Sequence, residues 1–229
     1  MKITIVYDDI AYNDNLTPGW GFSSVIELAD RIIMFDTGGN GTVLLSNMED
    51  LGINPRNIDV VFLSHIHSGH CDGLGSLLFI NSNIKVYLPQ SFPEKYKKGI
   101  LDFGAEVEEI YQPGKIFDGV FTTGEIAGVV PEQSLALVSK KGLVVLTGCA
   151  HYGIVNIVQK LKGVTGDDAH LVLGGFHSQG KSVGHDFKKM GVEKAAPCHC
   201  TGDEALTVLR NTYNDNFIEI GVGKEIVID

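Results

Sequence analysis

The stretch VVFLSHIHSGH, residues 60–70, decides the fold of this chain. Four apolar residues, Val60–Leu63, are followed at once by a histidine-rich turn that begins at Ser64. A short, continuous apolar run is typical of a strand buried on both faces, and its abrupt polar end indicates a loop at the edge of a sheet. Residues 60–70 therefore predict a β-strand that delivers polar groups at its carboxyl end.

Three later segments have the same form, an apolar run that ends in a histidine. They are LVVLTGCAH (residues 143–151), HLVLGGFH (170–177) and KAAPCHCTG (194–202). Open α/β sheets place their ligands at the carboxyl ends of strands, so four such ends predict one functional site. The side chains that we expect there are His65, His67, His70, Cys149, His151, His177 and His199.

The remaining segments predict strands and helices in both halves of the chain. Strands are expected at residues 2–6, 23–28, 31–36, 85–88, 107–111, 120–123 and 134–139, and from 217 and 225. Helices are expected at 43–51, 74–79, 154–161, 182–190 and 203–211, with a helical turn at 93–97. Strands followed by segregated helices, once in each half, predict two sheets packed face to face with helices outside. We therefore expect a four-layer α/β/β/α sandwich in a single domain, residues 1–229.

Composition excludes several partners. The chain has 229 residues and a formal net charge of −10, so neither nucleic acid nor an anionic membrane is an expected partner. The first residues lack the apolar core of a secretory signal, and no apolar run approaches the roughly 20 residues of a membrane span. We expect a cytoplasmic protein that acts on a small molecule; its oligomeric state is not predicted.

The histidine cluster favours a metal site. Three neutral imidazoles within six residues, at His65, His67 and His70, can face one or two metal ions. Zinc takes nitrogen ligands at about 2.0–2.1 Å, and a catalytic zinc keeps one position for water. The alternative is a group of unconnected surface histidines, which the apolar strand in front of them disfavours.

The four cysteines favour metal or redox chemistry over a disulfide framework. All four, Cys71, Cys149, Cys198 and Cys200, lie within two positions of a histidine, in a chain without a secretion signal. Cys71 and Cys198 could equally be small buried hydrophobes. A structural zinc held by Cys198 and Cys200 is a lesser alternative, because C-x-C lacks the usual C-x-x-C spacing.

These motifs together resemble the metallo-β-lactamase superfamily over essentially the whole chain. The resemblance is carried by Asp36-Thr37-Gly38 at a strand end, by the H-x-H-x-x-H of residues 65–70, by Thr147-Gly148-Cys149 and by the final His199. Residues 148–157, 174–177 and 199–202 are similar to one branch, named after an archaeal dihydropterin transferase of methanopterin biosynthesis. The resemblance implies the four-layer fold and a centre of one or two divalent ions, zinc above all, with manganese or iron as alternatives.

The resemblance also implies roles for the site residues. His65 and His67 would bind a first ion, His70 and His199 a second, and Asp36 would orient a histidine from behind. For the third ligand of the first ion we assign His151, with Glu132 as a weaker alternative. His177 would lie beside the ions and contact substrate or donate a proton.

Three positions depart from the superfamily pattern. Gly69 stands where an aspartate ligand is expected, Asp72 where glycine is expected, and Cys149 where a bridging aspartate is expected. A thiolate can replace a carboxylate on zinc, whereas glycine offers no ligand atom. Either Asp72, Cys71 or Cys149 compensates, or the protein binds a single ion.

Three functions remain open at this point. The first is a metal-dependent hydrolase of a small ester, thioester or phosphodiester, with His177 or Asp72 as catalytic acid. The second is a transferase resembling the dihydropterin branch, with an aromatic slot formed by Trp20, Tyr152 and Phe176. The third is a metal- or ligand-binding protein without catalysis, a possibility raised by Gly69.

Overall fold

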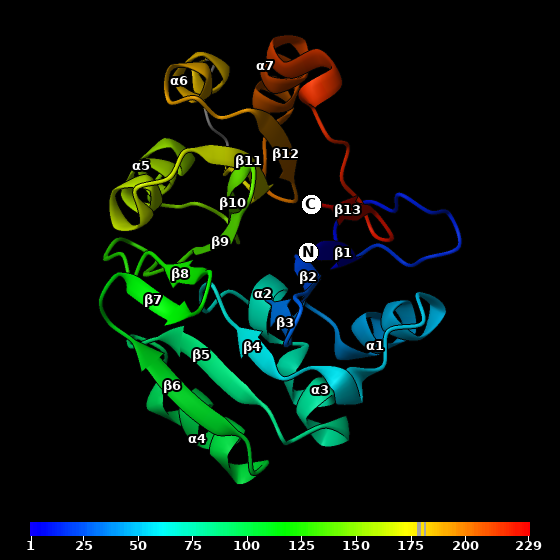
Figure 1. Ribbon diagram of the computed structural model, residues 1–229. Helices are drawn as coiled ribbons and strands as arrows, with labels where there is room; N and C mark the ends of the chain where they lie inside the picture. Colours follow the sequence, from blue (N-terminus) through cyan, green and yellow to red (C-terminus); the bar gives the residue numbers. More distant parts are fainter. Residues whose placement is uncertain (178–179, 181) are drawn as a thin grey trace. The chain divides into compact units, whose positions relative to one another are not determined.

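The structure is a computed structural model that describes residues 1–177, 180 and 182–229. The chain divides into two compact units, and each has a sheet of its own (Figure 1). The first unit comprises residues 1–111 with 221–228, and the second comprises residues 112–220 with Asp229. The prediction of a single domain stays a prediction.

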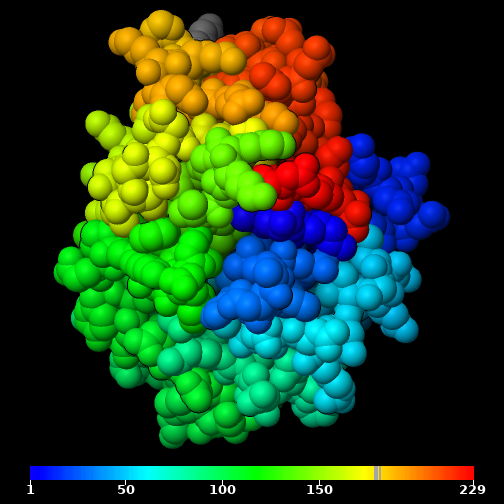
Figure 2. Space-filling view, viewed as in Figure 1, coloured from blue at the N-terminus to red at the C-terminus, as the bar shows by residue number. Residues whose placement is uncertain are grey.

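The first unit contains a seven-stranded sheet in the order β13-β1-β2-β3-β4-β5-β6. Its strands are β1 (Lys2–Tyr7), β2 (Ser23–Glu27), β3 (Ile32–Phe35), β4 (Val60–Phe62), β5 (Lys85–Pro89), β6 (Glu106–Ile110) and β13 (Glu225–Val227). Strands β3 to β6 are parallel, so their carboxyl ends share one edge. At the other end of the sheet β13 pairs antiparallel with β1, and Figure 2 shows the first and last residues side by side in dark blue and red.

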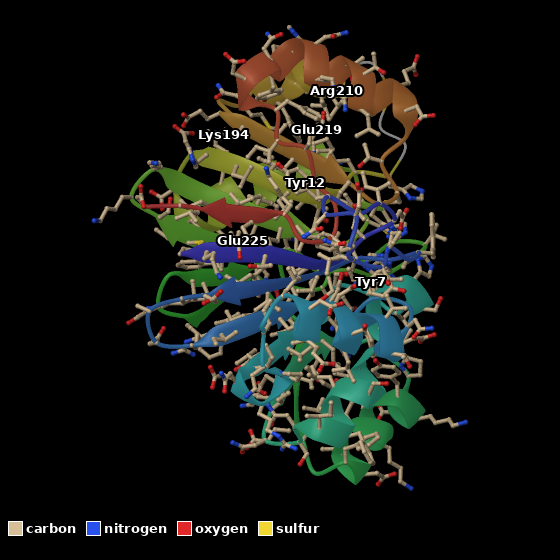
Figure 3. All side chains as sticks on the ribbon, turned by 90° about the vertical axis from the view of Figure 1, so that its right-hand side faces the viewer. Tyr7, Tyr12, Lys194, Arg210, Glu219 and Glu225 are labelled. Carbon is tan, nitrogen blue, oxygen red and sulfur yellow. The ribbon has the colours of Figure 1, made fainter. Side chains whose placement is uncertain are left out.

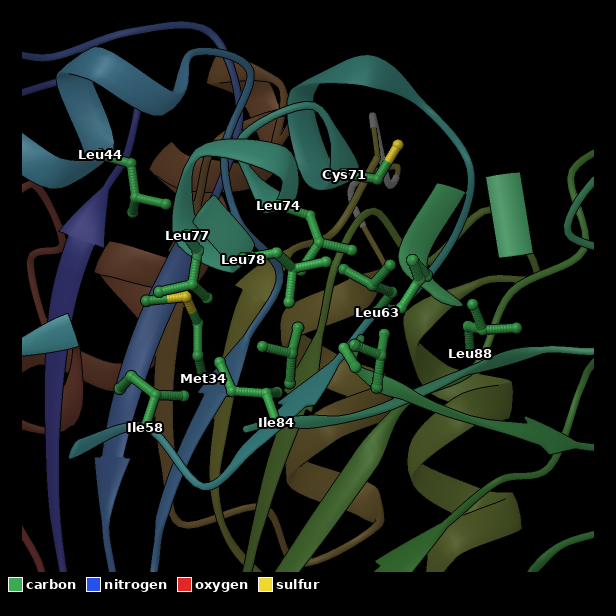
Figure 4. Close-up of a cluster of buried hydrophobic side chains, with 14 of the residues drawn as sticks. Met34, Leu44, Ile58, Leu63, Cys71, Leu74, Leu77, Leu78, Ile84 and Leu88 are labelled. Carbon is green, nitrogen blue, oxygen red and sulfur yellow. The ribbon is translucent and has the colours of Figure 1, made fainter. Parts of the chain in front are cut away.

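Helices cover one face of this sheet: α1 (Gly41–Asp50), α2 (Ser68–Cys71), α3 (Leu74–Ile80) and α4 (Glu94–Asp102), with a 3₁₀ turn, η1 (Pro55–Asn57). Helix α1 begins where the Asn40 side chain accepts hydrogen bonds from two backbone N–H groups of the first turn. Its buried Leu44 joins Leu74 and Leu77 of α3 above Met34 of the sheet (Figure 4). This apolar layer fixes the helices that flank the histidine loop.

The second unit contains a six-stranded sheet in the order β12-β11-β10-β9-β8-β7. Its strands are β7 (Gly114–Phe117), β8 (Val120–Thr122), β9 (Leu135–Ser139), β10 (Gly142–Thr147), β11 (Ala169–Gly175) and β12 (Lys194–Cys198). Strands β10, β11 and β12 are parallel. Their carboxyl ends therefore bring three of the predicted loops to one edge.

The sheet is covered by helices α5 (Ile154–Thr165), α6 (Val183–Lys189) and α7 (Asp203–Tyr213), the last followed by the 3₁₀ turn η2 (Asn214–Asn216) (Figure 1). Phe176 and Phe187 belong to the apolar core of this unit. Phe176 is fully buried, which corrects its assignment to a substrate slot. Arg210 of α7 pairs with Glu219 at 2.7 Å and holds the segment after the helix (Figure 3).

The predicted elements are present, with local differences. Strand β7 was not predicted, because its half-buried residues show no clear apolar run. The expected strand at Phe217 is only an isolated bridge to Ala195. Helix α4 continues to Asp102 because Ile100 packs into the core. Among the described residues, no helix is both long and apolar enough to cross a membrane.

Candidate functional site

Asp36 is the centre of the polar network in the first unit. It follows β3 directly, is completely buried and has a left-handed backbone conformation with φ of 55°. Its carboxylate accepts hydrogen bonds from the Ser64 backbone N–H, the Ser64 hydroxyl and Nδ1 of His70, each at 2.7 Å. The strained turn therefore aims one carboxylate at the histidine loop that follows the neighbouring strand β4.

Asp36 decides which nitrogen of His70 carries the proton. An ionised carboxylate can only accept hydrogen bonds, so Nδ1 of His70 carries the proton. In the neutral ring the lone pair then lies on Nε2. This arrangement, a carboxylate behind an imidazole, is the one that orients metal-binding histidines.

Ser64 fixes the position of the proton on His65 in the same way. Its single hydroxyl proton is donated to Asp36, so the hydroxyl oxygen accepts from Nδ1 of His65 at 2.8 Å. The lone pair of neutral His65 therefore also lies on Nε2. The sequence pattern does not identify Ser64 as a site residue, and its only signal there is its place directly before His65.

His65 and His67 face each other through ring nitrogens. Nε2 of His65 lies 3.1 Å from Nδ1 of His67, and the rings are inclined by 79°. Two ligands of a tetrahedral zinc with bonds of about 2.0–2.1 Å lie about 3.3 Å apart. The pair therefore fits two ligands of one ion, with a shift of a few tenths of an ångström.

Cys71 lies in the apolar core of the first unit. Its thiol donates to the backbone oxygen of Ile66 at 3.2 Å and belongs to the apolar cluster beneath α3. Burial raises the pKa of Cys71 to about 12, so the thiol stays protonated at neutral pH. The interpretation of Cys71 as a small buried hydrophobe fits its surroundings.

Asp72 is exposed at the end of α2. It lines a pocket of about 430 Å³ whose other walls include Ile66, Leu78 and Tyr96. The wall is largely apolar, and the Tyr96 hydroxyl is engaged with the backbone oxygen of Cys71 at 2.7 Å. Asp72 thus lies next to the histidine loop but belongs to a pocket formed by α3 and α4.

Gly69 is glycine because another loop lies against it. A Cβ atom at this position would lie 3.1 Å from Cα of Gly21 and 3.4 Å from the Trp20 ring. The approach is closed by a hydrogen bond from the Phe22 N–H to the Gly69 oxygen at 3.0 Å. The space for an aspartate side chain is therefore taken by the loop that carries Trp20.

The loop that carries Trp20 packs against the side chain of Tyr7. It lies at the end of β1 (Figure 3) and is almost fully buried. A Cβ atom at Gly19 would lie 2.5 Å from the Tyr7 hydroxyl, and one at Gly38 would lie 2.5 Å from its ring. Glycines at both positions let two loops settle on the tyrosine, while burial raises the pKa of Tyr7 and keeps it neutral.

The second unit repeats the carboxylate-histidine arrangement at His151. Buried Glu132 accepts from Nδ1 of His151 at 3.1 Å and from the Tyr152 N–H at 2.7 Å. Both oxygens of Glu132 thus have partners, and the lone pair of neutral His151 lies on Nε2. This geometry favours His151 over Glu132 as a ligand.

The two strand ends beside it carry His177 and His199. Both residues have positive φ, 38° and 48°, a conformation that is unusual for residues other than glycine. His177 is exposed, and its ring centroid lies 4.9 Å from that of His151. Such turns at three neighbouring strand ends, including Ala150 with φ of 57°, are typical of functional sites.

Cys149 and Cys200 lie together at this edge. The Cys200 thiol lies 3.7 Å from the backbone oxygen of Cys149. A hydrogen bond with the Cys149 side chain, aided by nearby His199, lowers the pKa of Cys200 below its usual value. Cys198, by contrast, is buried at the end of β12.

Comparisons with known proteins identify relatives over the whole chain. The sequence pattern of the metallo-beta-lactamase superfamily matches residues 16–153. The chain is 30% identical to 7,8-dihydropterin-6-methyl-4-(beta-D-ribofuranosyl)-aminobenzene-5'-phosphate synthase of Methanocaldococcus jannaschii, over 97% of this chain and 95% of that protein.

Solved structures of the same superfamily or fold are also similar to this chain. Tm1679, described as a metal-dependent hydrolase of the beta-lactamase superfamily, is 26% identical, with a TM-score of 0.82 over 100% of both chains. The metallo-beta-lactamase fold protein YhfI from Bacillus subtilis has a TM-score of 0.72 over 98% of both chains at 16% identity, a likeness of fold alone. The predicted fold class is confirmed by these matches.

Proposed function

Because the chain belongs to the metallo-β-lactamase superfamily, we propose that it is a metal-dependent hydrolase of a small ester, thioester or phosphodiester. One observation carries this proposal. In three histidines Nδ1 is hydrogen-bonded: His65 to Ser64, His70 to Asp36 and His151 to Glu132. In each neutral ring the lone pair therefore lies on Nε2. Histidines prepared in this way fit a divalent cation.

The ligands are assigned from the histidine and cysteine motifs of the sequence. One ion would take His65 and His151, with His67 beside His65, and a second would take His70 and His199. Cys149 would take the position at which the superfamily pattern has a bridging aspartate. Imidazole and thiolate together favour zinc, while manganese or iron remain alternatives.

A bound divalent ion would supply Lewis acidity and a water molecule that is acidic enough to react at neutral pH. The protein's own residues hold the ligands in place and protonate the leaving group. We assign the proton donor to His177, because it is exposed and its ring lies next to that of His151. Asp72 is the alternative donor, although it lines the pocket at α3 and α4.

Metal content per chain tests the centre directly. Untagged protein, reconstituted with zinc and dialysed, is analysed by plasma mass spectrometry beside His67→Ala and a matched control, His185→Ala, on the exposed side of α6. We expect one or two ions in the wild type and in the control, and fewer in His67→Ala. Absence of metal under every loading condition would overturn the proposal.

A panel of chromogenic substrates tests the reaction. Aryl esters, a thioester, a lactone and a phosphodiester are offered to zinc-loaded protein, to chelated protein and to His67→Ala. We expect turnover of at least one class that is lost on chelation and in the variant. If protein with confirmed metal hydrolyses none of them, simple hydrolysis is wrong.

The relation to the dihydropterin synthase supports a second candidate, a transferase that acts on a related heterocycle. Trp20 and Tyr152 are 68% and 48% exposed, unlike Phe176, and aromatic rings of this kind can stack on a planar heterocycle. Trp20 is the only tryptophan, so its fluorescence reports binding directly. Saturable quenching by a pterin, absent for a phosphodiester of similar size, would favour transfer over hydrolysis.

A further inference from the structure

Two cysteines at the site are close in space and distant in sequence. The Cys200 thiol approaches the backbone oxygen of Cys149 to 3.7 Å across 51 residues. Both residues belong to the second unit and lie at the carboxyl ends of β10 and β12. Neither is in a disulfide.

Gly175 of the intervening strand β11 makes the approach possible. A Cβ atom there would lie 2.7 Å from Sγ of Cys200 and 3.4 Å from Cα of Cys149. It would also lie 2.4 Å from the Gly148 oxygen, so any side chain would push the loops apart. At Gly175 the strand thus has no side chain to separate the Cys200 thiol from Cys149.

A disulfide requires two cysteines whose side chains already point toward each other, because its geometry is narrow. The Cys200 sulfur already lies against Cys149, 3.7 Å from its backbone oxygen, so the sulfur of Cys149 is within reach of a side-chain rotation. The remaining cysteines do not offer an equivalent pair: Cys71 is engaged with Ile66 in the first unit, and Cys198 is buried at the end of β12.

We propose that Cys149 and Cys200 are a redox modification site, which a peroxide converts to an intramolecular disulfide. One sulfur attacks the peroxide, the O–O bond breaks, and that sulfur becomes a sulfenic acid while the first water leaves. The second sulfur displaces the hydroxyl group as another water, and the S–S bond forms. Two thiols lose two hydrogens in total, and the peroxide is reduced by two electrons.

Oxidation would also change metal binding, a consequence that rests on the proposed function. A cysteine in a disulfide cannot be a thiolate ligand, so Cys149 would leave the metal centre. Bound metal should in turn protect the thiol from peroxide. The pair would couple the activity of the protein to the oxidant level.

The test uses the full chain, before and after removal of metal with a chelator, and hydrogen peroxide as the probe. Free thiols are counted in denaturant, and a non-reduced digest is analysed by mass spectrometry. We expect the wild type to lose two of its four thiols, to yield one linked peptide pair containing Cys149 and Cys200, and to recover both thiols with a dithiol reductant.

Three variants complete the design. Cys200→Ser and Cys149→Ser should each abolish the linked peptide, with folding checked by circular dichroism, whereas Cys71→Ala should leave it intact. A different pairing, or oxidation to sulfinic acid without a linkage, would overturn the proposal. If the chain forms the linked peptide but never binds metal, the redox proposal stands and only the proposed function is contradicted.

Discussion

Gly69 and Gly21 approach each other so closely that neither position accommodates a side chain. A Cβ atom on Gly21 would lie 2.0 Å from the Gly69 oxygen, and one on Gly69 would lie 3.1 Å from Cα of Gly21. The absence of the superfamily's aspartate at position 69 is thus matched by a second loop that fills its place.

Restoring that aspartate should therefore fail. Gly69→Asp forces the loop carrying Trp20 outward, and overpacking of this kind costs about 1–3 kcal/mol of unfolding free energy. We expect a lower urea midpoint and no gain of esterase activity. The matched control is Gly75→Ala, at a helical glycine with open space around it, which should not destabilise. A stable Gly69→Asp protein with new activity would show that room exists.

Asp36→Asn should weaken metal binding without removing a ligand. The amide cannot accept both the Ser64 hydroxyl and Nδ1 of His70 as the carboxylate does, so His70 loses its fixed orientation. Loss of such a partner typically costs 10–100-fold in metal affinity. Competition with a chromophoric chelator measures it, with exposed Asp30→Asn as control. Equal affinities in both variants would remove Asp36 from the site.

Glu132→Gln and His151→Ala separate the ligand from its partner. If His151 is the ligand, His151→Ala should lower the zinc content, whereas Glu132→Gln should keep the stoichiometry with roughly 10–100-fold weaker binding. Zinc content and affinity are measured on the same preparations. The reverse ranking would identify Glu132 as the ligand.

Tyr213→Phe should reveal a stability term that depends on alkaline pH. Burial raises the pKa of Tyr213 above its usual value of about 10, and its hydroxyl donates to the Val192 oxygen at 3.0 Å. At pH 8 the variant should be less stable by about 0.5–1.5 kcal/mol, the value of one hydrogen bond.

Above pH 10 this difference should shrink. The unfolded chain then loses the phenolic proton while the folded chain keeps it. The unfolding free energy of the wild type therefore falls by up to about 1.4 kcal/mol per pH unit. The variant has no such group at position 213, and all other titrating groups are shared. Urea unfolding at pH 8 and pH 10.5 measures the difference; an unchanged difference would mean that Tyr213 ionises equally in both states.

Much of the fold was predictable because its signals are local. The apolar run Val60–Leu63 with its polar end specified β4 and the histidine loop, and the same pattern before Cys149 and His199 specified β10 and β12. Strand β7 and the end of α4 were missed, since half-buried strands and helix ends depend on contacts with distant residues.

By itself, the sequence determined which donor atoms are available and that they follow strand ends. Only the tertiary structure decided how they are held: that Asp36 and Ser64 set the tautomers of His70 and His65, that Glu132 supports His151, and that Phe176 is core. It also decided that Gly69 is packed under the loop of Trp20. The physical reason is that these contacts mostly join residues far apart along the chain, and local periodicity carries no information about which distant hydrogen-bonding groups meet.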